Sequence, residues 1–178
     1  HMGFVLLGAF TGSVYGISGA VFQMFNHAAA IGILFMLSGY IHEQAGTRDI
    51  ALLKGLKVTM PRTATLLVLA SLAAMGVPIY SSFISEYMVI VGAISFSLIL
   101  AIAVLIPIIT VAYFLWMMRR TVTSLPLLGV RHHDMKMFSA SSLFIYLIPL
   151  FILLIFPSLI LDVVNPLSQV FVTLVRGG

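Results

Sequence analysis

The sequence contains no cysteine and very little charge. Without cysteine, the chain cannot build a disulfide framework, a thiolate metal site or an iron–sulfur centre. Charged residues make up 8% of the 178 residues, against roughly 25% in an ordinary soluble domain. So few charges cannot cover the surface of a globular protein of this size. The composition therefore excludes a water-soluble fold.

Hydrophobic residues make up 61% of the chain, and the mean hydropathy is +1.18. Each stretch of about 20 apolar residues is a candidate membrane helix. The net charge of +4 does not indicate nucleic-acid binding, because nine Lys and Arg are better explained as topology signals beside membrane spans. The sequence also lacks a Walker loop and a GxGxxG motif after a strand. We predict an integral membrane protein that contacts lipid and binds no nucleic acid.

The apolar runs predict an all-α polytopic membrane helix bundle, in which blocks of charged residues mark the loops. Residues 63–118 are apolar apart from one Glu, which is far longer than one crossing needs, so the chain must turn back near residues 92–97. The predicted organisation of residues 1–178 is a helix end at 1–12, spans at 17–41, 63–94, 96–118 and 138–161, charged loops at 43–62 and 119–136, and a tail at 162–178.

The distribution of basic residues predicts the orientation in the membrane. Residues 43–62 contain four basic and two acidic residues, and residues 119–136 contain four basic and one acidic residue. Three crossings place both loops on the same side. By the positive-inside rule this side is the cytoplasm, or the matrix or stroma in an organelle, and the tail at 162–178 lies outside.

The span at 63–94 is longer than a bilayer requires and is predicted to be broken near residues 76–82. It contains Gly76-Val77-Pro78, followed by Ser81 and Ser82. Pro78 lacks an N–H group and its ring clashes with the carbonyl four residues back, so the helix is interrupted there. Ser81 or Ser82 is expected to cap the second half-helix. Interrupted helices hold ion sites in transporters, whereas the alternative is an ordinary proline kink.

Glu86 is the only acidic or basic side chain within any predicted span. A carboxylate inside the membrane costs about 2.5–3.5 kcal/mol on insertion scales, so it normally has a function. The alternative is a structural role near the positive end of the second half-helix, but that dipole contributes under about 1 kcal/mol at most sites. We therefore interpret Glu86 as a candidate proton-binding group.

Two histidines are predicted to lie at the same depth as Glu86. Counted at helical rise from the outer turns, Glu86 lies about 13 Å, His27 about 15 Å and His1 about 16 Å into the membrane. Histidine both donates and accepts protons near neutral pH, so the three groups form a candidate lateral proton relay. The alternatives are that each histidine is a buried hydrogen-bonding group between helices, and that His1 and Met2 are not native.

No metal or cofactor site is predicted. The run Arg131-His132-His133-Asp134 contains ligand types, but adjacent residues on a charged loop usually form a solvated turn.

Three segments, HMGFVLLG, QMFNHAAAIGILFMLSGYIHEQAGTRDI and MGVPIYSSFISEYMVIVGA, resemble the proton-channel subunit called chain 4 or chain M of respiratory complex I. That family is grouped with the multisubunit cation/proton antiporters. The resemblance covers nearly the whole chain, in order and at matching spacing. One difference is that the family usually has Gly-Glu-Phe at the carboxylate, where this chain has Ser85-Glu86-Tyr87.

The resemblance implies the C-terminal third of a subunit with two inverted repeats, each containing a broken helix, that moves protons while the complex reduces quinone. Glu86 then occupies the position of the key carboxylate, and His27 and His1 lead towards it. The implied partners are other membrane subunits of the complex, and electron transfer and the chemistry of NADH and quinone are expected in partner subunits. The implied location is the cell inner membrane or an organelle inner membrane. Two alternatives remain: a subunit of a sodium/proton antiporter or membrane-bound hydrogenase, and a purely structural membrane subunit.

Overall fold

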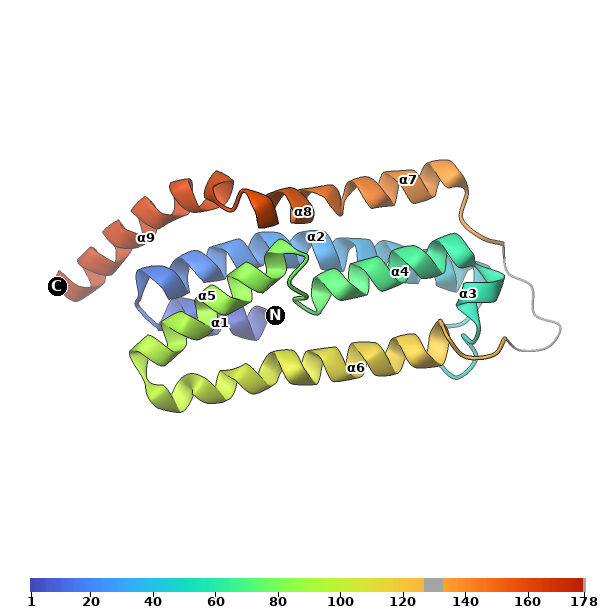
Figure 1. Cartoon of the computed structure of the whole chain (residues 1–178), viewed down its shortest axis with the longest axis horizontal. Coiled ribbons are helices and arrows are strands. Elements are labelled where there is room, and N and C mark those ends of the chain that lie inside the picture. Colours follow the sequence, from blue (N-terminus) through green and yellow to red (C-terminus); the bar gives the residue numbers. More distant parts are fainter. Residues whose placement is uncertain (127–132, 178) are drawn as a thin grey trace.

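The computed structural model describes residues 1–126 and 133–177, and helices make up most of these residues. They form a bundle in which most helices run roughly along one direction (Figure 1). The elements are α1 (Met2–Phe10), α2 (Val14–Ala45), α3 (Leu56–Thr59), α4 (Pro61–Ala74), α5 (Ser81–Phe96), the 3-10 helix η1 (Leu98–Val104), α6 (Leu105–Thr121), α7 (Met137–Ile145), α8 (Ile148–Ile155) and α9 (Ser158–Gly177). The expected all-helical class is confirmed.

Three helical segments of the described chain are long and apolar enough to cross a membrane: Val14–Ala45, Leu98–Thr121 and Met137–Ile155. Their outward-facing side chains are largely apolar, as Ile99, Ile102 and Ile109 illustrate on η1 and α6. Large exposed apolar surfaces of this kind mark contact with lipid or with other proteins. The chain is therefore built as a membrane protein.

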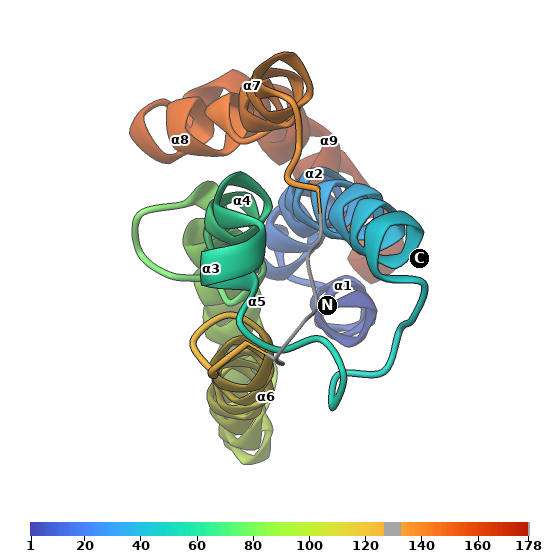
Figure 2. The same ribbon diagram turned by 90° about the vertical axis from the view of Figure 1, so that its right-hand side faces the viewer.

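Helices α4 and α5 follow one another along α2, and each is too short to cross a membrane alone (Figure 1). Helix α4 ends at Ala74 and α5 begins at Ser81. This interruption falls where the sequence predicts a break, near residues 76–82. Seen from the end of the bundle, α7 and α8 lie on one side of α2 and α4, and α6 lies on the other side (Figure 2).

Several helix ends differ from the predicted boundaries. Helix α2 extends the span predicted at 17–41 in both directions, because Ser13 accepts a hydrogen bond from the Gly16 N–H at the start and Gly46 adopts a left-handed conformation at the end. The span predicted at 138–161 ends earlier, at Ile155. The cause is Pro157, which restricts the preceding residue Phe156 to a non-helical conformation.

The residues predicted as a tail at 162–178 continue a helix, α9, as far as Gly177. Polar residues recur along it at helical spacing, at Ser158, Asp162, Asn165 and Gln169. The sequence reasoning missed this helix because an amphipathic pattern has no long apolar run. Helix α9 packs against the start of α2, where the Ser18 hydroxyl donates a 3.0 Å hydrogen bond to Ser168 Oγ.

Small residues bring the helices around α2 close together. A side chain at Gly8 of α1 would lie 2.5 Å from the Gly16 carbonyl oxygen, and one at Gly92 of α5 would lie 2.6 Å from the Gly16 Cα. At the other half of α2, buried Ala30 and Ile33 belong to the same apolar core as the alanines of α4. Membrane helices commonly pack through such small residues. These contacts fix α1 and both half-helices against α2.

A loop residue distant in sequence holds the first turn of α4. The Asp134 carboxylate accepts hydrogen bonds from the backbone N–H groups of Arg62 (2.9 Å) and Thr63 (3.1 Å), from the Thr63 hydroxyl (2.9 Å) and from its own neighbour Met135 (2.8 Å). In the same loop segment, the His133 carbonyl oxygen accepts a hydrogen bond from the Tyr40 hydroxyl. Asp134 therefore serves as the N-terminal cap of α4, which lacks a polar residue of its own at Met60.

Partial burial alone would raise the pKa of Asp134, but the hydrogen bonds from Arg62, Thr63 and Met135 together hold it below its ordinary value of 3.8. The carboxylate form is thus stabilised by folding. Because the folded-state pKa is the lower one, this stabilisation is fully present above about pH 4 and is lost as the pH falls through the folded-state pKa.

We predict that Asp134→Ala lowers the free energy of unfolding by about 1 kcal/mol, the typical cost of losing a helix cap. Thermal unfolding of the purified protein in detergent at pH 7 would measure this. The control is Asp49→Ala, since Asp49 is exposed and its carboxylate bonds only within its own turn, to the Ala51 N–H. Equal stability of the Asp134 variant and the wild type would contradict the capping role.

Candidate functional site

The interruption between α4 and α5 is shaped by Gly76 and Pro78. Gly76 has a φ of +66°, a left-handed conformation that L side chains rarely adopt, and the chain then turns through Val77 and Pro78. The Tyr80 N–H returns to the Val77 carbonyl at 3.0 Å, and Tyr80 is extended where α5 begins. The expected capping role of Ser81 or Ser82 is wrong, because Tyr80 occupies the cap position and the Ser81 hydroxyl donates instead to Asn26 Oδ1.

Glu86 lies inside α5, little more than one turn from the interruption, and is only 6% exposed. Its carboxylate rests directly against Gly76, where an added Cβ would lie 2.5 Å from Glu86 Oε2. Glu86 Oε1 is 3.8 Å from His1 Nε2. The absence of a side chain at Gly76 thus creates the space that the carboxylate occupies.

The three titratable residues predicted at one depth lie together in the structure. His1 Nδ1 is 3.1 Å from His27 Nδ1, with the two rings edge to face and their centroids 5.3 Å apart. One ring must donate and the other accept in this hydrogen bond, so the two Nδ1 atoms differ in protonation. His1 lies between the other two groups. The order is Glu86, His1, His27, across three helical segments.

Four buried polar side chains join α2 to α5, and three of them, Gln23, Asn26 and Ser85, were missed by the sequence reasoning. Gln23 and Asn26 of α2 face Ser81 and Ser85 of α5, and each of these residues is at most 1% exposed. The contacts are Asn26 Nδ2 to Ser85 Oγ (2.9 Å), Ser81 Oγ to Asn26 Oδ1 (2.7 Å) and Ser85 Oγ to Gln23 Oε1 (2.5 Å). The available signal was the spacing within each pair: Gln23 and Asn26 are three residues apart and Ser81 and Ser85 are four apart, which places each pair on one helix face.

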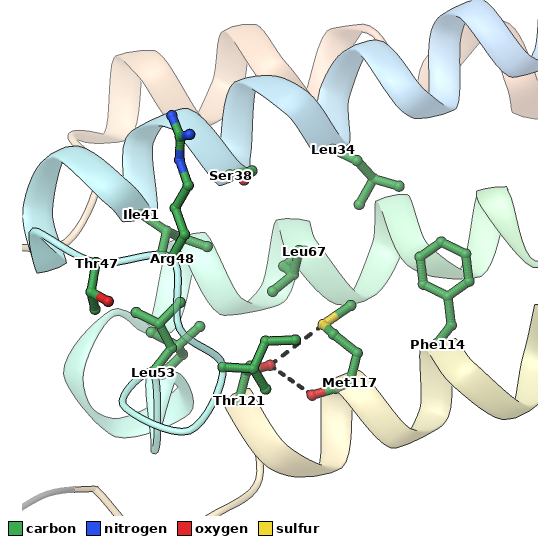
Figure 3. A pocket seen from close by; sticks show the side chains of 12 residues that line it. Leu34, Ser38, Ile41, Thr47, Arg48, Leu53, Leu67, Phe114, Met117 and Thr121 are labelled. Atoms are coloured by element: carbon green, nitrogen blue, oxygen red, sulfur yellow. Dashed lines mark hydrogen bonds between the residues drawn. The ribbon is translucent and has the colours of Figure 1, made fainter.

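A cavity of about 400 Å³ opens beside Glu86 between the interruption and α6. Its α6 wall consists of Pro107, Ile108 and Val111, and Glu86 is the acidic residue of its lining. A second cavity of about 320 Å³ lies between α2, α4 and α6, near the loop that carries Arg48 (Figure 3). Apolar side chains such as Leu34, Leu67 and Phe114 dominate this second cavity. It offers no carboxylate or histidine, so the first cavity is the better candidate for ion access.

Within residues 1–126 and 133–177, no group of three or more His, Asp or Glu side chains is arranged to hold a metal ion. The sequence run 131–134 contains metal-ligand residue types, but Arg131 and His132 lie outside the described residues. Asp134 is occupied by its hydrogen bonds to α4.

An all-helical membrane bundle with a carboxylate buried at a helix interruption has the architecture in which membrane transporters hold ion sites. Residues 1–114 match the family described as "NADH:quinone oxidoreductase/Mrp antiporter, TM". The chain belongs to this family, as the resemblance of its motifs implies. It is accordingly an integral protein of the cell inner membrane or an organelle inner membrane.

Named relatives agree with this family. NADH-quinone oxidoreductase subunit M of Rhodobacter capsulatus is 32% identical, over 93% of this chain and 33% of that protein. F(420)H(2) dehydrogenase subunit M of Methanosarcina mazei is also 32% identical, over 99% of this chain and 36% of that protein. The chain thus spans about a third of the length of these relatives.

A solved structure, respiratory complex I from Thermus thermophilus with bound NADH, contains a chain similar to this one. The TM-score is 0.91 and the sequence identity 29%, over 98% of this chain and 37% of that chain. The similarity therefore includes all of the interrupted helix and the helices that surround it.

We predict that Gly76→Ala destabilises the protein. The left-handed conformation costs an alanine about 1–2 kcal/mol, and the new Cβ also displaces the Glu86 carboxylate. Thermal unfolding in detergent would measure the loss. The control is Gly39→Ala in α2, where a Cβ enters open space and alanine favours the helix, so stability should be unchanged or slightly higher. A Gly76 variant as stable as the control would contradict this account.

Proposed function

We propose that this chain translocates protons across the membrane as part of a respiratory NADH:quinone oxidoreductase or a related donor:quinone enzyme. Glu86 is the proton-binding carboxylate, and His1 and His27 are its relay partners. The observation that carries the proposal is the series Glu86, His1, His27 at the helix interruption, in which successive groups lie 3.8 Å and 3.1 Å apart. Membership of the family and the names of the relatives support the enzyme class.

A proton moves through this series by shuttling across an imidazole ring. With Nδ1 of His1 protonated and bonded to His27 Nδ1, His1 Nε2 is free to take a proton from the Glu86 carboxyl group. His1 then passes its Nδ1 proton to His27 and keeps the new proton on Nε2. The 3.8 Å between His1 Nε2 and Glu86 Oε1 exceeds hydrogen-bond length. Transfer therefore requires the pair to close by about 1 Å.

Electron transfer belongs to partner subunits under this proposal. The relatives are named for different electron donors, NADH and F(420)H(2), although they share the membrane chain. The absence of cysteine fits a subunit without iron–sulfur chemistry. The implied partners are other membrane subunits, together with lipid around the exposed apolar faces.

We predict that Glu86→Gln in the intact complex abolishes most of the proton translocation that this subunit supports, because the amide cannot release a proton. Proton uptake by membrane vesicles during quinone reduction would measure it. The matched control is Glu43→Gln, which makes the same chemical change at an exposed position near the end of α2 and should leave translocation intact. Electron transfer to an artificial acceptor reports assembly. Unchanged proton translocation in the Glu86 variant would remove the residue from the mechanism.

We also predict that His27→Phe slows proton translocation while preserving the edge contact with His1, since phenylalanine keeps an aromatic ring but has no proton to exchange. His42→Phe, on the same helix but near its end, is the control and should have little effect. Equal translocation rates for the two variants and the wild type would show that the series ends at His1.

A further inference from the structure

Two rows of polar side chains face each other between α2 and α5, beside the Glu86 carboxylate. Gln23 lies one turn before His27 on α2, and Ser85 directly precedes Glu86 on α5. The Gln23 side chain faces Ser85, the residue before Glu86, and its Nε2 atom has no hydrogen-bond partner among residues 1–126 and 133–177. Gln23 is 1% exposed, so this free donor is removed from bulk water.

The hydroxyl group of Ser85 has two possible acceptors and a single proton. Ser85 Oγ lies 2.5 Å from Gln23 Oε1 and 2.9 Å from the Ser82 carbonyl oxygen. It also accepts a bond from Asn26 Nδ2 at 2.9 Å. A hydroxyl donates one hydrogen bond and accepts two. Ser85 therefore donates either to Gln23 or to Ser82, but not to both at once.

Each choice corresponds to one orientation of the Gln23 amide. When Ser85 donates to Gln23 Oε1, the Nε2 donor of the amide remains available to Glu86, which suits an ionised carboxylate. When the amide is rotated by half a turn, Nε2 donates to Ser85 Oγ, and the Ser85 proton goes to the Ser82 carbonyl. Gln23 then turns its oxygen acceptor towards Glu86, which suits a protonated carboxyl group. The two orientations have nearly the same shape, so they need no repacking.

We propose that Gln23 is a positioning residue whose amide orientation follows the protonation state of Glu86 and is passed on to Ser85. This inference rests on the proposed function, in which Glu86 gains and loses a proton. A buried polar group that loses its hydrogen-bond partner is destabilised. A fixed donor would satisfy only the ionised form of Glu86, whereas a reversible amide satisfies both forms. Gln23 thereby prevents the carboxyl group from being trapped in one state.

Besides Gln23, the groups near Glu86 are two histidines, a tyrosine, an apolar wall and the buried hydroxyl of Ser82, which has no hydrogen-bond partner among the described residues. The titratable neighbours are His1 before α1 and His27 on α2, and both exchange protons in the proposed relay. On its own helix, Tyr87 lines the adjacent cavity. The α6 wall of that cavity is formed by Pro107, Ile108 and Val111, which carry no titratable group. Ser82 lies one turn before Glu86 and is buried.

The test is infrared difference spectroscopy of the intact complex during a pH titration. Loss of the Glu86 carboxyl band in Glu86→Gln assigns that band. In the wild type we expect an amide signal to change together with it. In Gln23→Leu the amide signal should disappear, and the carboxyl band should shift to a higher wavenumber because its hydrogen bond is lost. Ser85→Ala leaves Gln23 and Glu86 in place, so the amide signal should persist but at a shifted wavenumber, because Gln23 loses its hydrogen bond to Ser85.

The control variant is Gln44→Leu, the same change on the same helix near its cytoplasmic end, which should keep both signals. One outcome is that the Glu86 band titrates in Gln23→Leu at the same wavenumber, and with the same amide signal, as in the wild type. This result would overturn the inference and leave the proposed function standing. A wild-type complex in which no Glu86 band titrates would overturn both. If Gln23 had only a structural role, Gln23→Leu would change the assembly of the complex, and the amide and carboxyl bands would still change together. This result would also overturn the inference.

Discussion

A single carboxyl group removed from water constrains this part of the bundle. Glu86 is 6% exposed and lies between apolar helices. Such a group is tolerated only where the protein supplies polar partners. The interruption of the helix provides the space, because Gly76 has no side chain, and α1 and α2 provide the partners. The position of the carboxylate therefore depends on the break in the helix.

The two half-helices are held by different means. Helix α4 is fixed at its start by Asp134 and along its length by the apolar core that it shares with α2. Helix α5 is fixed by hydrogen bonds from Ser81 and Ser85 to α2 and by the close approach of Gly92 to Gly16. Because neither half depends on the other for its position, the residues between them can adopt a conformation that is set by Gly76.

The sequence predicted the features that depend on rare residues. A proline within an apolar run, and a single carboxylate in the same run, are unusual enough to indicate the interruption and Glu86 without coordinates. The depth estimate for His1 and His27 relied only on helical rise. Their functional roles stay predictions. Gln23, Asn26 and Ser85 were missed because uncharged polar residues are ordinary in membrane helices, and only the packing of α2 on α5 shows that they meet. The helix α9 was missed because its apolar residues are not consecutive.

The polar residues follow a path across the bundle. From Ser85 and Glu86 on α5, the contacts pass to His1 at the start of α1 and to His27 and Gln23 on α2. On the side of α4, the core around α2 is apolar and contains buried residues such as Leu37 and Ala70. Under the proposed function, a proton on Glu86 therefore passes sideways, first to His1 and then to His27, rather than along α4. Lateral transfer of this kind requires that each group be satisfied both before and after the proton moves. The amide of Gln23 and the two nitrogens of each imidazole ring have that property, because each offers both a donor and an acceptor.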